Sequence, residues 1–163
     1  MSATSAAIST GRSNPIQAIF WGGLIAGILD ILYAFAISYY RGGRSPIFVL
    51  QSVAGGALGR DATFSGGIKT AALGLVCHFI VATCAATAYV AVSRVLRFMV
   101  SQAVVCGLLY GAIVFGFMNW VVLPISAYHS KLPQFSGRLV MDIIFMMILV
   151  GLPIGLMTRR FAR

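Results

Sequence analysis

The stretch that decides the fold is the apolar run "IQAIFWGGLIAGILDILYAFAISYY", residues 16–40, which contains a single charged residue, Asp30. A hydrocarbon core about 30 Å thick requires roughly 20 apolar residues per helix, so this run is long enough to cross a bilayer. The whole chain has the same character, because 60% of its 163 residues are hydrophobic and only 9% are charged. Composition therefore predicts an integral membrane protein.

Three further runs have spanning length, and with the first they predict an all-α protein of four transmembrane helices. The expected spans are residues 16–40, 67–93, 98–123 and 138–158. A short turn containing Arg94 and Arg97 forces the second and third spans into an antiparallel hairpin, and Pro124 is expected to end the third. Residues 1–14 are rich in Ser, Ala and Thr and predict a flexible tail, which leaves residues 15–163 as one membrane domain.

A short helix is expected in the first loop, over residues 45–59. Ser45 suits the N-cap, Pro46 the first helical position and Gly59 the end. This segment is too short to span, so it either lies in the interface or enters the membrane and returns. We favour the interface, because a re-entrant turn needs buried polar partners that the sequence does not identify.

The first apolar run could also be interpreted as a cleaved signal peptide. Its length exceeds the usual apolar region of about 7–15 residues, and it carries Asp30. These two features favour a retained helix.

The net charge of +9 does not indicate a nucleic-acid partner. The basic residues fall in loops and tails beside the spans, where lipid phosphates are their natural contacts, so the expected partner is the lipid bilayer. They divide equally between the two sides of the membrane, and their number alone does not set the orientation. Clustering of arginines next to the second and fourth spans favours both termini in the cytoplasm.

The three cysteines, Cys77, Cys84 and Cys106, all fall within predicted spans, so no disulfide framework is implied. Cys77 and Cys84 share a helix face near His78, but no metal-binding motif accompanies them. Packing as small apolar side chains is the better interpretation, and neither a metal nor a cofactor is expected.

Asp30 should face the protein interior, because a charge within a span is costly in lipid. It lies about ten residues from the first loop on one span, and His78 lies about ten residues from it on the next, or about 15 Å each at 1.5 Å per residue. We therefore hypothesise a hydrogen-bonded pair of Asp30 and His78. The alternative is that such a pair only fixes helix register.

Two further polar residues fall in the same half of the membrane. Asn119 can reach headgroups or a polar pocket, and Asp142 follows Arg138 by one turn and is expected to pair with it. The other half is almost entirely apolar. This asymmetry predicts a polar pocket open to one side, formed by Asp30, His78, Asn119 and Asp142.

Glycines at helical spacing predict where the spans pack against one another. The expected packing positions are Gly23, Gly27, Gly74, Gly107, Gly111, Gly151 and Gly155. Pro153 lies between the last two, so the fourth span should be kinked there.

Several segments, "GGLIAGILD", "LQSVAGGALG", "GGIKTAALGLVCHF", "GLLYGAIVFGFMNWVVLPISA" and "VGLPIGLMTRR", resemble an uncharacterised family of small bacterial four-helix inner-membrane proteins. The likeness covers residues 16–160. It implies a multi-pass protein of the bacterial inner membrane with Asp30, Gln51, His78, Asn119 and Pro124 on the characteristic segments. It supplies no activity.

Three function classes remain open at this point. The first is a transporter-like protein that binds a proton or small solute through Asp30 and His78, as a homodimer if four helices enclose too little volume. The second is a non-catalytic membrane partner or assembly subunit that docks through its glycine faces. An enzyme is not expected, because Ser126 and His129 share a loop at an unspecific spacing and no nucleophile and base form a convincing arrangement.

Overall fold

The computed structural model describes residues 14–127 and 136–161, and these residues form helices and no strand. Four helical segments are long and apolar enough to cross a membrane, which confirms the predicted four-span all-α fold. They are Pro15–Gly42 (α1), Gly67–Val95 (α4), Ala103–Ile125 (α6, η1 and α7) and Gly137–Phe161 (α8, η2 and α9). The expected tail lies almost wholly outside the described residues.

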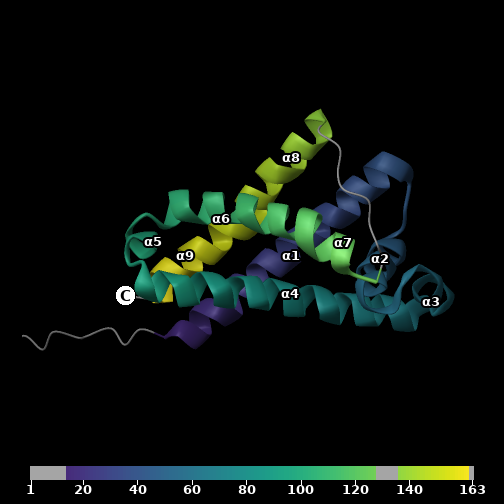
Figure 1. The fold of residues 1–163 in the computed structure, drawn as a ribbon, viewed down its shortest axis with the longest axis horizontal. Coiled ribbons are helices and arrows are strands. Elements are labelled where there is room, and N and C mark those ends of the chain that lie inside the picture. The colour runs from purple at the N-terminus through teal and green to yellow at the C-terminus, as the bar shows by residue number, and fades with distance from the viewer. Residues whose placement is uncertain (1–13, 128–135, 162–163) are drawn as a thin grey trace, which may run out of the picture.

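The first and fourth spans pack against each other, the second packs on the first, and the third packs on the fourth. The helix α4 and the segment α6 (Ala103–Phe117) run in opposite directions and are joined through the four-residue helix α5 (Phe98–Ser101). In Figure 1, α1 and the segment formed by α8 (Gly137–Met146) and α9 (Leu152–Phe161) run obliquely across them. The third span therefore starts at Ala103, later than residue 98, because the backbone breaks its helical course at Gln102.

The first and last spans meet at one end of the molecule. The amide of Asn14 donates a hydrogen bond of 2.8 Å to the carbonyl of Phe161. The turn between α4 and α5 lies at this same end, whereas α2, α3 and α7 lie at the other (Figure 1). We call these the terminal end and the loop end.

The first loop contains the expected short helix, α2 (Pro46–Leu58), which begins where the capping residues indicated. The Ser45 hydroxyl accepts a hydrogen bond of 3.3 Å from the Phe48 amide, and the chain leaves the helix at Gly59 with a φ of 81°. A second short helix, α3 (Arg60–Ser65), follows and was not predicted. Both helices lie at the loop end (Figure 1).

The helix α2 packs against α4 through a buried polar network. The Gln51 side chain donates hydrogen bonds to the Gly67 carbonyl (3.0 Å) and the Thr70 hydroxyl (3.3 Å). The Thr63 hydroxyl donates to the Gln51 carbonyl (2.7 Å), and the Thr70 hydroxyl donates to the Thr63 carbonyl (2.7 Å). The buried polar partners that the sequence did not identify are therefore present beside α2.

Two of the spans contain a π-helical turn just before a proline. These turns are η1 (Met118–Val122), ahead of Pro124, and η2 (Met147–Gly151), ahead of Pro153. Proline lacks an amide hydrogen and crowds the carbonyl four residues earlier, and a widened turn relieves both problems. Pro124 accordingly does not end the third span, which continues through α7 (Leu123–Ile125).

The glycines predicted for packing lie where helix backbones approach one another. A methyl group on Gly107 would lie 2.7 Å from the Gly151 carbonyl oxygen, and one on Gly155 would lie 2.5 Å from the Ala103 carbonyl oxygen. Contacts of this kind also occur between α1 and α4 and between α2 and α4. Between α1 and α4 they involve Gly23 against the Thr83 backbone and Gly27 against the Phe79 ring, and between α2 and α4 they involve Gly74 against the Leu50 carbonyl. Between the third and fourth spans, Gly111 faces the Met146 backbone and Gly151 faces Gly107.

The core consists of small, aliphatic and aromatic side chains from α1, α4 and the fourth span. Its fully buried members are Ala26, Ala86, Tyr89 and Ile154, with Val150 beside them. The buried Tyr89 ring packs edge-on against Tyr110, whose hydroxyl donates a hydrogen bond of 2.7 Å to the Ala85 carbonyl. The polar side chains that line the two cavities described below lie on either side of this core, toward the loop end and the terminal end.

Candidate polar cavity

A cavity of about 260 Å³ lies between α1, the third span and α8, on the loop-end side of the core. The helix α1 contributes one face to it at intervals of three and four residues. The cavity is lined by Asp30, Tyr33, Ala34, Ile37 and Arg41 from α1, Phe115 and Asn119 from the third span, and Leu139, Asp142 and Met146 from the fourth. Three of the four predicted pocket residues, Asp30, Asn119 and Asp142, therefore line one cavity.

Asp142 is held by two residues of α1. The Arg41 guanidinium donates to both carboxylate oxygens, at 3.0 Å and 2.9 Å, and forms an ion pair. The Tyr33 hydroxyl donates to Oδ1 at 2.7 Å while its ring stacks on Phe145 with centroids 4.5 Å apart. Bidentate pairing of this kind neutralises the carboxylate and fixes its direction.

The expected pair of Arg138 and Asp142 is not formed. Arg138 is exposed in the first turn of α8, and the carboxylate of Asp142 points to Arg41 on the neighbouring helix instead. Sequence spacing identifies partners on the same helix, but a guanidinium from another helix offers bidentate geometry, which a single turn of helix provides less readily.

The hypothesised hydrogen bond between Asp30 and His78 is also absent. The two groups are near enough to interact electrostatically, but the His78 Nε2 atom bonds to the Gly27 carbonyl at 2.9 Å. A carbonyl can only accept, so Nε2 carries the hydrogen. His78 thus bonds to the backbone of α1 one turn before Asp30, and it does not line the cavity.

Asp30 differs from Asp142 in lacking a bonded partner. Within residues 14–127 and 136–161, its carboxylate has neither a hydrogen bond nor an ion pair. The Asn119 amide donates to the Phe115 carbonyl at 2.9 Å, and no hydrogen bond to its side-chain oxygen occurs in the described part of the chain. The cavity therefore presents oxygen acceptors to anything that enters it.

Tyr33 and Arg41 are the site residues that sequence reasoning missed. They follow Asp30 by three and eleven residues, so the helical repeat places all three on one face of α1. A search for polar side chains on the face of Asp30 would have found both. Arg41 was instead counted as a loop residue because it lies at the end of the first span.

The other chemistry considered from the sequence finds no support in the described residues. They contain no group of three or more His, Cys, Asp or Glu side chains that could hold a metal ion. Cys77, Cys84 and Cys106 are free thiols. The Ser126 hydroxyl donates to the Leu123 carbonyl at 2.7 Å, and His129 lies outside the described residues.

Comparison with protein-family models, with curated proteins and with solved structures finds no match for this chain. The family resemblance drawn from its segments therefore stays a prediction, and the function must be argued from the cavity.

Proposed function

We propose that this chain is a transporter-like membrane protein that binds a proton or a small solute at Asp30. The observation that carries the proposal is the unpaired Asp30 carboxylate on the wall of a cavity. A bare carboxylate within a membrane span is costly, and a bound proton or cationic group removes that cost.

The surroundings of Asp30 limit what can bind. The Asp142 charge is already neutralised by Arg41, so Asp30 supplies the negative charge that remains in the cavity. Asn119 adds an amide oxygen, while Ala34, Phe115 and Met146 add apolar walls. A volume of about 260 Å³ is below the roughly 300–1,000 Å³ of pockets for drug-sized ligands, which favours a proton or a small amine.

The cavity supports binding from one side rather than an open pore. The core residues Ala26 and Ile154 are fully buried and lie between this cavity and the terminal end. Transport would require these helices to move, whereas binding would not.

Substitution of Asp30 by Asn tests the proposal. We expect that infrared titration of the purified protein in lipid will show a carboxyl band that Asp30→Asn removes, because that group takes up the proton. Vesicles loaded with a pH-sensitive dye would report whether proton binding is coupled to flux.

Asp61→Asn is the matched control, since Asp61 is exposed on α3 and does not line the cavity. It should leave the Asp30 band and any flux unchanged. An Asp30→Asn protein that folds normally and retains the full wild-type carboxyl titration would contradict the proposal.

We also propose that the protein resides in the bacterial inner membrane with both termini in the cytoplasm. Arg94, Arg97, Arg159 and Arg160 lie beside the membrane spans at the terminal end, and none forms an ion pair within the described residues. Unpaired arginines close to the spans are typical of cytoplasmic ends. A reporter enzyme that functions only in the periplasm is fused to the C-terminus, and activity of that fusion would contradict this orientation.

The alternative proposal is a non-catalytic partner or assembly subunit, including a homodimer. Its original support was the glycine faces, but Gly23, Gly107 and Gly151 now pack against helices of the same chain. The cavity at Asp30 therefore supports the binding proposal better. A purified assembly with a stoichiometric second subunit and no dependence on Asp30 would favour the alternative.

A further inference from the structure

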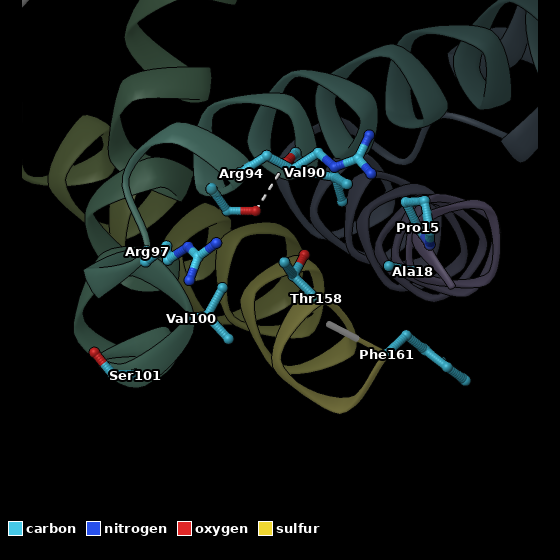
Figure 2. A pocket seen from close by; sticks show the side chains of 10 residues that line it. Pro15, Ala18, Val90, Arg94, Arg97, Val100, Ser101, Thr158 and Phe161 are labelled. Carbon is cyan, nitrogen blue, oxygen red and sulfur yellow. Dashed lines mark hydrogen bonds between the residues drawn. The ribbon is translucent and has the colours of Figure 1, made fainter. Parts of the chain in front are cut away.

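A second and larger cavity, of about 610 Å³, opens at the terminal end of the bundle. It shares no lining residue with the cavity at Asp30. Its walls come from the start of α1, the end of α4, the turn into α5 and the end of α9 (Figure 2). In this view Thr158 of α9 lies between Arg97 on one side and Ala18 of α1 on the other.

Two arginines bring positive charge to this cavity. In Figure 2 the side chain of Arg94 extends in the direction of Pro15, while that of Arg97 points toward Thr158. Neither guanidinium has a hydrogen bond or ion pair within residues 14–127 and 136–161. All three acidic residues of the chain lie elsewhere, on α1 at Asp30, on α3 at Asp61 and on α8 at Asp142.

The remaining polar groups of the cavity are already bonded to the backbone. The Ser93 hydroxyl donates to the Val90 carbonyl and the Thr158 hydroxyl donates to the Ile154 carbonyl, both at 2.8 Å. The Ser101 hydroxyl likewise donates to the Phe98 carbonyl, at 3.0 Å. Hydroxyls are uncharged, so the side-chain donors left to a ligand are the two guanidinium groups.

The rest of the lining is apolar. Pro15, Ala18, Val90 and Val100 add aliphatic side chains to the walls, and Phe161 adds an aromatic one. A cavity with cationic donors and apolar walls, placed where a span ends, suits a group that is anionic at one end and apolar at the other. Guanidinium groups pair with phosphate oxygens in bidentate geometry.

We propose that this cavity binds a phosphate group through Arg94 and Arg97. The phosphate has two sources, the headgroup of an anionic phospholipid or free phosphate, and the apolar walls favour the lipid. This phosphate site is independent of the proton or solute site at Asp30, so the two ends of the molecule bind different ligands.

The experiment measures retention of phosphatidylglycerol by the purified protein in native mass spectrometry, with phosphatidylcholine as the zwitterionic reference. For the double variant Arg94→Gln/Arg97→Gln we expect retention to fall by well over about thirtyfold, because loss of two charges near an anionic surface alone costs a factor of about five each and the direct bonds to the phosphate are lost as well. Arg94→Lys/Arg97→Lys should restore part of that loss, because it keeps the charge but not the bidentate geometry.

The matched control is Arg159→Gln/Arg160→Gln, which removes the same charge from the terminal end at two residues that do not line the cavity, although Arg160 contacts the Phe161 ring of the lining, 5.7 Å from its centroid. It should lower retention by no more than about thirtyfold, the effect of two positive charges in the general surface field. Circular dichroism and gel filtration establish that each variant is folded before retention is compared.

A second arm separates the two sources of phosphate. In lipid-free detergent, inorganic phosphate alone is titrated while thermal unfolding is followed. Stabilisation that disappears in Arg94→Gln/Arg97→Gln would support the phosphate site with a soluble source, and lipid retention without it would support the headgroup. Equal loss of retention in the two double variants, or neither lipid nor phosphate dependence on Arg94 and Arg97, would overturn the proposal.

Discussion

Asp142 receives three hydrogen bonds from α1, two from Arg41 and one from Tyr33, and this is the densest polar contact between spans among the described residues. It ties the end of the first span to the start of the fourth. Because the carboxylate is 22% exposed and the guanidinium 34% exposed, solvent weakens the attraction without removing it. The contact therefore contributes to the fold as well as to the wall of the cavity.

Replacement of Arg41 by Gln should lower the free energy of unfolding by about 2 kcal/mol, because it leaves a partly buried carboxylate with one hydrogen bond in place of three. Arg138→Gln is the control, because the sequence predicted Arg138 as the partner of Asp142. It should change stability by less than about 0.5 kcal/mol, as is usual for an exposed side chain. Thermal unfolding of both variants in the same detergent compares them, and equal effects would show that the ion pair contributes nothing.

At the scale of residues, the sequence predicts which way a charged side chain faces but not which group it bonds to. The sequence indicated that Asp30 faces the protein, because a charge in a span avoids lipid, and it placed Asp142 in the same polar pocket. It did not identify which groups each would meet. The choice between Arg138 and Arg41, or between Asp30 and the Gly27 carbonyl for His78, depends on helix rotation by fractions of a turn.

At the scale of the elements, the third and fourth spans approach so closely that their glycines face each other's backbone. A methyl group on Gly151 would overlap the Gly107 carbonyl oxygen, whereas one on Gly116 would find ordinary contact with the Trp120 ring at 3.7 Å. Both residues lie within helical segments. Comparing their substitutions therefore separates the effect of crowding against a neighbouring helix from the effect of alanine on the helix itself.

Gly151→Ala should therefore destabilise the protein by about 1–3 kcal/mol, because a well-packed contact must open to admit the extra methyl group. Gly116→Ala should change stability by less than about 1 kcal/mol, in the stabilising direction, since alanine is the better helix former. Chemical or thermal unfolding in detergent measures both. A Gly151→Ala protein as stable as the wild type would mean that this contact is looser than the structure describes.

The elements themselves were largely predictable, because span length and capping residues are local properties. The N-cap at Ser45 and the first, second and fourth apolar runs lie close to where their residues indicated, whereas the third span starts five residues later and runs past Pro124. The π-helical turns were not predicted, since Pro124 and Pro153 reveal a disturbance but not whether a helix ends, kinks or widens there. The helix α3 was not predicted either, because six residues are too few to show a helical periodicity.

At the scale of the whole molecule, the first loop is part of the packed structure rather than a free connection. Gln51 bonds α2 to the start of α4, and the amide of Ala127, after α7, donates a hydrogen bond of 3.0 Å to the Gly56 carbonyl. The short helix thus joins three of the chain's segments at the loop end.

Gln51→Leu should loosen this arrangement, because it keeps the side-chain volume but removes both donated hydrogen bonds. We expect amide hydrogen exchange over residues 46–65 to quicken by about tenfold, the equivalent of about 1.4 kcal/mol, while exchange in the core of α1 stays unchanged. Ser52→Ala is the control, since the Ser52 hydroxyl bonds only to the Phe48 carbonyl of its own helix. Unchanged exchange in Gln51→Leu would mean that packing alone holds α2.

The π-helical turn η2 has a consequence for how the two ends of the molecule are related. Asp142 precedes Met147–Gly151 and Thr158 follows it, so one helix carries the acidic site and the arginine-lined cavity on either side of the widened turn. A π turn accommodates one residue more than the α turn it replaces. Deleting a single residue there would let the turn close to an ordinary α turn, so Asp142 and Thr158 would keep their faces toward the two cavities, whereas the same deletion in a regular α-helical stretch would rotate one half against the other by about 100°.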